Sequence, residues 1–259
     1  MDLRVKQVRD ILDELAGADQ LDSDGKEVVY DRELEKVKLL KREGIIEVVK
    51  KAIGKNAKRR RCAPFVFSEL YEISGIEDVF SEFLESADDI GRSEIIQTIG
   101  LRQLRNLVGV LNRHFHNESD QFCREMVLHS LGRIADESSL SIFVELMREK
   151  NHKYEWEILC ASHNFVRLEF REYLLSVYDN VTTKTIHKVM AAWGLAKLGE
   201  KEPYDYLVKM LGDPEIKTKT SFDPGHSVKA AQAIADINCW DFEWGKNSVG
   251  LIKSRISAS

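Results

Sequence analysis

The chain has 259 residues, of which 43% are hydrophobic and 31% charged, and its formal net charge is −5. This composition is typical of a folded, helix-rich protein with enough apolar material for a core. The acidic balance argues against general nucleic-acid binding, which normally depends on a basic surface, and it suits a partner that carries positive charge.

The N-terminal part of the sequence predicts three helices in succession. The first is expected over residues 3–15, because one apolar stripe at helical spacing consists of Val5, Val8, Ile11, Leu12 and Leu15. Further helices are expected over 31–43 and 45–53. Gly44 and Gly54 follow these two segments and are typical of helix ends.

A concentrated basic run, Lys55-Asn-Ala-Lys-Arg-Arg-Arg61, follows the third helix and precedes Pro64. Runs of like charge are usually solvated, so we expect a loop here. Binding of phosphate or of an acidic protein is the alternative interpretation. We place the boundary of an N-terminal helical cap, residues 1–62, at this run.

From residue 63 onward the sequence repeats. First helices are aligned at steps of 32 residues, with a last step of 39, on Ile99-Gly100, Leu131-Gly132, His163-Asn164, Leu195-Ala196 and Ile234-Ala235. Second helices are expected over 76–85, 104–115, 140–150, 168–178, 204–212 and 248–256. Repetition at this period is typical of stacked helix pairs that bury their apolar stripes against neighbours. We therefore predict an all-α fold, a right-handed α-α superhelix over 63–259, continuous with the cap.

Part of the repeat region resembles HEAT-type repeats of the short kind found in phycobilisome-lyase-like proteins. The resemblance rests on Leu211-Gly-Asp-Pro214, Asp223-Pro224 and Val228-Lys-Ala-Ala231. In that family a second helix ends with Leu, and the chain turns through Asp-Pro. The next helix opens with Val-Arg or Val-Lys, followed by paired alanines. The match covers about residues 126–256 and implies the repeat fold, whereas lyase activity does not follow from it. Glu118-Ser-Asp and Tyr154-Glu-Trp replace the usual Asp-Pro openings.

No residue set predicts a catalytic centre, a metal site or a cofactor. Phosphate-binding loops and nucleophile motifs are missing from the sequence. His114 and His116 point about 200° apart on a helix and would converge on a metal only in an extended loop. Residues 20–31 depart from a calcium loop at several ligand positions, so a turn is expected. Four further histidines are expected to be packed or hydrogen-bonded: His129, His163, His187 and His226.

The cysteines and the N-terminal segment bear on location. Cys123, Cys160 and Cys239 lie in apolar helical patterns and Cys62 has no Cys-x-x-Cys partner, so buried free thiols are expected. Free thiols are typical of a reducing compartment. The first residues lack the apolar stretch of a secretion signal, and no apolar run approaches the ~20 residues that span a bilayer. We expect a cytoplasmic protein that does not enter a membrane.

These patterns favour a non-enzymatic solenoid that binds another protein. The candidate binding residues lie on the second helices, between the apolar positions. They are Glu145, Arg148, Glu149, Asp205 and Lys209. The cluster Trp240-Asp-Phe-Glu-Trp244 either caps the last repeat or contributes binding energy through Trp240, Asp241 and Trp244. The more specific prediction is a bacterial immunity-type protein that binds and neutralises a basic toxin domain, onto which acidic charge would steer it.

Two alternatives stay open. Some alkylpurine DNA glycosylases use HEAT-like repeats with Trp and Asp near the lesion, to which Trp240, Asp241 and Trp244 are faintly similar, and residues 55–61 would then hold phosphates. The acidic net charge opposes this reading, and we do not expect nucleic acid as a partner. The family resemblance alone suggests a scaffold or chaperone in cofactor or complex assembly.

Overall fold

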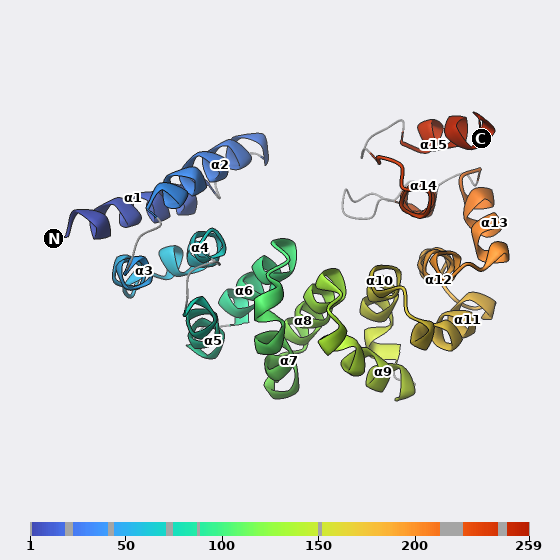
Figure 1. Ribbon diagram of the computed structural model, residues 1–259, viewed down its shortest axis with the longest axis horizontal. Helices are drawn as coiled ribbons and strands as arrows, with labels where there is room; N and C mark the ends of the chain where they lie inside the picture. The colour runs from blue at the N-terminus through green and yellow to red at the C-terminus, as the bar shows by residue number, and fades with distance from the viewer. Residues whose placement is uncertain are drawn as a thin grey trace. The chain divides into compact units, whose positions relative to one another are not determined.

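The computed structural model describes residues 2–18, 23–40, 44–70, 75–86, 89–149, 152–212, 225–242 and 248–258. Within these ranges the regular structure consists of fifteen α-helices and four short 3-10 helices, without a strand (Figure 1). The expected all-α fold is confirmed. None of the helices in these ranges is long and apolar enough to cross a membrane. The chain divides into two compact units, Met1–Ile134 (unit 1) and Ala135–Ser259 (unit 2).

Unit 1 begins with α1 (Leu3–Ala18), α2 (Ser23–Leu39) and α3 (Ile45–Ile53). The predicted apolar stripe of α1 is buried, and α1 packs against α2, α3 and α4. The second helix starts at Ser23, eight residues earlier than predicted, and ends at Leu39. The turn expected over residues 20–31 is therefore wrong from Ser23 onward. Gly44 adopts a left-handed conformation (φ 75°) and is the N-cap of α3. Within the described residues it therefore marks the start of the third helix, whereas it was predicted to end the second. Gly54 ends α3 as predicted.

The prediction of a loop at residues 55–61 is wrong, because α4 (Ala57–Ser68) begins inside the basic run. The side chain of Asn56 caps this helix by accepting a hydrogen bond from the Arg59 N–H (3.1 Å). The guanidinium of Arg59 donates to both carboxylate oxygens of Asp13 on α1, each at 2.7 Å. One charge of the run is thus neutralised by a distant residue. The predicted boundary after residue 62 falls inside α4, which crosses it as one helix.

The rest of unit 1 consists of helices in close succession: α5 (Ile76–Ser86), α6 (Asp89–Leu101), a 3-10 turn (Arg105–Leu107), α7 (Val108–Asn117) and α8 (Gln121–Ile134). Helix α6 packs against α4, α5 and α8, and α7 packs against α5 and α8. The rings of Phe67 on α4 and of Phe80 and Phe83 on α5 meet edge to face in the core. Two predicted second helices, 76–85 and 104–115, are therefore confirmed to within a few residues.

Unit 2 continues the alternation of helices: α9 (Leu140–Arg148), α10 (Glu155–Phe165), α11 (Arg171–Asp179), α12 (Thr185–Lys197), α13 (Lys201–Met210), α14 (Gly225–Ile237) and α15 (Ser248–Ala258). Short 3-10 turns precede α9, α10 and α11. Helix α12 packs against α10, α11, α13 and α14, and α14 also packs against α13 and α15. The predicted second helices of this region are confirmed, with ends shifted by up to three residues.

Small residues allow close contacts between first helices. One small residue recurs at each first helix, at steps of 32 residues and then 39, and these residues are Thr98, Ser130, Ser162, Gly194 and Ala233. All five are buried. At Gly100 an added Cβ would lie 2.8 Å from the Cα of Ser130, and at Gly194 it would lie 2.7 Å from the Oγ of Ser162. At Gly100 the first helices therefore touch almost backbone to backbone, whereas Gly194 lies against side-chain atoms of Ser162 and Leu174. The superhelix and the HEAT resemblance stay predictions.

Candidate functional site

The five candidate residues on the second helices of unit 2 are all exposed: Glu145, Arg148 and Glu149 on or next to α9, and Asp205 and Lys209 on α13. Their apolar neighbours Phe143 and Leu207, which lie 64 residues apart, are 0% exposed. The helical period explains the difference, because the stripe that packs inward fixes which positions remain outside. The candidates lie on two helices, with α11 between them in the chain.

The beginnings of the second helices carry ion pairs that the sequence analysis did not identify. Arg167, just before α11, donates to Glu137, which lies in the 3-10 turn before α9. Arg171, the first residue of α11, pairs with Glu200 at the start of α13 (2.6 Å). All four side chains are substantially exposed. Exposed pairs of this kind contribute little to stability, so their charges are accessible to a charged partner.

The predicted C-terminal cluster is only partly described. Trp240 is half-buried and Asp241 is exposed, whereas Trp244 lies outside the described residues. Arg255 on α15 places its guanidinium over the ring of Trp240 (5.8 Å) and donates from Nη1 to the backbone oxygen of Asp241 (3.1 Å). A cavity of about 180 Å³ beside these residues is lined partly by Phe242. Trp240 and Asp241 thus contact the last helix of the unit.

A chain of polar and aromatic contacts crosses the first helices of unit 2. The imidazole of His163 on α10 stacks on the indole of Trp193 on α12, with ring centroids 3.8 Å apart and an interplanar angle of 15°. The Nε1–H of Trp193 donates to Asp236 Oδ2 on α14 (2.9 Å), and Lys197 Nζ donates to the same oxygen (2.8 Å). The only sequence signal was that these residues fall near the alignment positions of consecutive repeats.

Two histidines of unit 2, His163 and His187, contact other side chains of the protein. Burial lowers the pKa of His163 to about 4, so its ring is neutral at pH 7. His187 Nδ1 lies 2.5 Å from Glu155 Oε1, and the His187 ring lies beside that of Trp156. The expectation of packed or hydrogen-bonded side chains is confirmed for His163 and His187.

His114 contacts a carboxylate. Its Nε2 lies 2.9 Å from Glu118 Oε2, and Arg92 Nε donates to the same oxygen (2.9 Å). Burial alone would raise the pKa of Glu118, but hydrogen bonds from the Asp120 N–H and from Arg92 hold it below its ordinary value. No cluster of three or more potential metal ligands occurs among the described residues. The arrangement orders the turn between α7 and α8.

The cysteines differ in their surroundings. Cys62 and Cys123 are buried and Cys160 is half-buried, whereas Cys239 is exposed. The prediction of a buried Cys239 is wrong, because α14 ends at Ile237 and Cys239 lies in the following turn with φ 54°, where the helical stripe no longer applies. Burial raises the pKa values of Cys123 and Cys160 to about 12. Both thiols are therefore protonated at neutral pH and are poor nucleophiles.

Comparison of the chain with protein family models, with curated proteins and with solved structures found no match. The resemblance to phycobilisome-lyase-like HEAT repeats therefore stays a prediction, and any proposal about function depends on the residues described above.

Proposed function

We propose that this chain is a non-enzymatic protein-binding module that uses three second helices of unit 2, α9, α11 and α13, as its contact surface. The observation that carries the proposal is the separation of residues on α9 and α13. Phe143 and Leu207 are fully buried, while the charged residues at intervening positions, such as Glu145, Asp205 and Lys209, are exposed. A surface of exposed charges on packed helices suits recognition of a complementary protein.

The side chains that could otherwise perform chemistry support a binding role. The thiols of Cys123 and Cys160 are protonated. The ring of His163 is stacked and neutral, and the carboxylate of Asp236 is bonded to Trp193. These groups serve internal packing, so an enzymatic mechanism has no evident nucleophile or base among them.

The partner that fits best is a basic protein in the cytoplasm, and the more specific form of the proposal is a bacterial immunity-type protein that blocks a toxin domain. The net charge of −5 and the exposed carboxylates of Glu145, Glu149 and Asp205 would steer such a partner onto the surface. The exposed pairs Glu137–Arg167 and Arg171–Glu200 could exchange an internal partner for an external one at little cost in stability.

Affinity purification of the tagged full chain from its own organism, with mass spectrometry of the retained proteins, tests the proposal. We expect one stoichiometric basic partner, which the triple variant Glu145→Lys, Glu149→Lys, Asp205→Lys fails to retain. A control variant, Glu77→Lys, reverses an exposed acidic residue on α5 of unit 1 and should retain the partner.

Recovery of the same partner by the triple variant would refute the proposed surface. Recovery of no stoichiometric protein by the unchanged chain would refute the binding role itself. No observation favours the glycosylase or scaffold alternatives. Trp240 and the backbone of Asp241, on which the glycosylase alternative depends, contact Arg255 within the chain.

A further inference from the structure

Unit 1 contains a cavity of about 530 Å³ between its first two helices. Helix α1 contributes polar side chains and Ile11, and the second wall comes from α2 and the residue that follows it. The lining residues are Gln7, Asp10, Ile11, Glu14, Arg32, Glu33, Lys36, Leu39 and Leu40. The volume is sufficient for a small organic group, and charged or polar side chains outnumber aliphatic ones in the lining.

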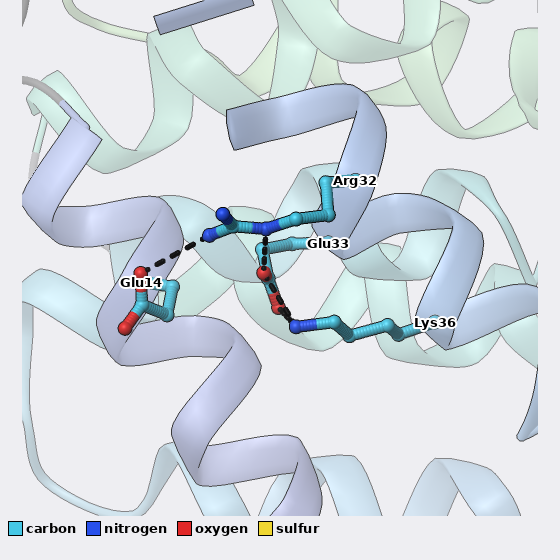
Figure 2. A network of polar contacts seen from close by, with 4 residues as sticks. All are labelled: Glu14, Arg32, Glu33 and Lys36. Carbon is cyan, nitrogen blue, oxygen red and sulfur yellow. Dashed lines mark hydrogen bonds and ion pairs between the residues drawn. The ribbon is translucent and has the colours of Figure 1, made fainter. Parts of the chain in front are cut away.

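A buried carboxylate organises one wall of the cavity. The side chain of Glu33 is 1% exposed, and its oxygens accept hydrogen bonds from Lys36 Nζ (2.7 and 2.8 Å) and from Arg32 Nε (2.7 Å) (Figure 2). A buried carboxylate is costly unless it is paired, and Lys36 and Arg32 supply the charges that pair with Glu33. Burial alone would raise the pKa of Glu33, but Lys36 and Arg32 hold it below its ordinary value. Glu33 therefore remains ionised at neutral pH.

The charged residues of the lining do not balance. Three carboxylates, Asp10, Glu14 and Glu33, face two cations, Arg32 and Lys36. Arg32 reaches Glu14 only through a longer contact, Nη2 to Oε2 at 3.3 Å, as Figure 2 shows. The lining thus carries one more negative than positive charge.

Two of the three carboxylates lie on one helix. Asp10 and Glu14 are four residues apart on α1, so they share a face of it. The charge of Asp10 contributes to the raised pKa of Arg59, but the Arg59 guanidinium donates its hydrogen bonds to Asp13 and to the Ala52 carbonyl. A further cation at the cavity would balance the charges of the lining.

Aliphatic side chains adjoin these charges. Ile11 is buried beneath them, and Leu39 in the same lining is 79% exposed. A large apolar side chain so exposed in a cavity lining offers a contact for an aliphatic stem. An anion fits poorly, because the cations already bind Glu33 and the net charge of the lining is negative.

We propose that this cavity binds an organic monocation with a short aliphatic stem, an alkylguanidinium or alkylammonium group. The cation would lie between the carboxylates of Asp10 and Glu14, and the stem would contact Ile11 and Leu39. Charge-assisted hydrogen bonds to carboxylates are the strong interactions in such a site. The same chemistry occurs in free small amines and in basic side chains of polypeptides. The inference depends on unit 1 alone and is independent of the proposed function.

A titration of the isotope-labelled full chain, followed by amide chemical shifts, tests the proposal. The probes are butylguanidinium and its neutral analogue butylurea, at matched ionic strength. We expect butylguanidinium to shift resonances of α1 and α2 with a Kd on the order of 1 mM, and butylurea to leave them unchanged. Equal shifts with both probes, or no shift with butylguanidinium, would overturn the proposal.

A third probe, N-acetylargininamide, distinguishes the sources of the cation. Binding as tight as that of butylguanidinium would assign the site to a basic side chain of a polypeptide. Binding of butylguanidinium alone would assign it to a free small cation, and both results support the site.

Variants locate the bound group. The double variant Asp10→Asn, Glu14→Gln should weaken butylguanidinium binding about tenfold, because it removes the carboxylates but keeps their shape. The matched control is Glu35→Gln on α2, an exposed residue outside the cavity that pairs with Lys38, and it should bind as the unchanged chain does. Thermal melting verifies that both variants fold. Unchanged affinity in a folded double variant would refute the assignment.

Discussion

Replacement of Gly100 by alanine tests the close helix crossing in unit 1. The added Cβ would lie 2.5 Å from Ser130 Oγ, 2.7 Å from its Cβ and 2.8 Å from its Cα. Comfortable contacts between such atoms are roughly 3.5–4.0 Å. A rotation of the Ser130 side chain would relieve only the first contact, since the Cβ and Cα move only with the backbone. Helices α6 and α8 would therefore have to separate.

The expected change in the free energy of unfolding for Gly100→Ala is the sum of opposing effects. Forcing an extra methyl group into a packed contact costs typically about 1–3 kcal/mol. Separation of the helices also strains the buried hydrogen bond from Ser130 Oγ to the Ile96 carbonyl (2.9 Å), which contributes about 1 kcal/mol. The intrinsic preference of a helix for alanine over glycine returns about 0.5–1 kcal/mol. We expect Gly100→Ala to lower the free energy of unfolding by about 1–3 kcal/mol.

Gly109 on α7 provides the control, because a Cβ there would meet only the Arg113 guanidinium, at 3.8 Å. Gly109→Ala should stabilise the protein by about 0.5–1 kcal/mol. Urea unfolding is followed by far-UV circular dichroism, which reports on both units, and by tryptophan fluorescence. All four Trp residues belong to unit 2, so a loss confined to unit 1 appears mainly in the dichroism. If Gly100→Ala proves as stable as Gly109→Ala, the reasoning about the crossing is refuted.

Three further predictions concern unit 2. Gly194→Ala should destabilise less than Gly100→Ala, because the atoms it meets are the ends of side chains, and Ser162→Gly should partly restore the urea midpoint. The folded-state pKa of His163, about 4, lies below its ordinary 6.5, so the unfolded chain binds the proton first and stability falls as pH drops from about 6.5 to 4. His163→Phe should therefore show a smaller loss of stability than the unchanged chain between pH 7 and pH 4.5, and an equal loss would contradict this. Trp193→Phe removes the hydrogen bond to Asp236 and should cost about 1–3 kcal/mol in urea unfolding, whereas a neutral result would show that the bond contributes nothing.

The helices were the part of the fold that local sequence could predict. The stripe from Val5 to Leu15 predicted α1, and the 32-residue steps predicted first helices that the structure contains. These inferences hold because the spacing of apolar residues at 3.6 per turn determines which face a helix can bury. The same logic placed Glu145 and Lys209 at the surface.

The failures have two causes, a partner that is distant in the chain and the end of a helix. Residues 55–61 looked like a solvated loop, yet Arg59 pairs with Asp13, 46 positions earlier in the chain, and the run joins a helix. Cys239 continued an apolar pattern that the end of α14 interrupts. Neither the Asp13 partner of Arg59 nor the end of α14 could be identified from the local pattern of charged or apolar residues.

The sequence by itself determined the all-α class, the approximate helix bounds and the exposure of the charged second-helix residues, because helical periodicity is a local property. Only the tertiary structure decided which side chains meet. It joined His163, Trp193 and Asp236 from three helices, and it placed Asp10 and Glu14 opposite the Glu33 ion pairs around one cavity. Such contacts depend on how helices pack against one another, and no spacing along the chain specifies that.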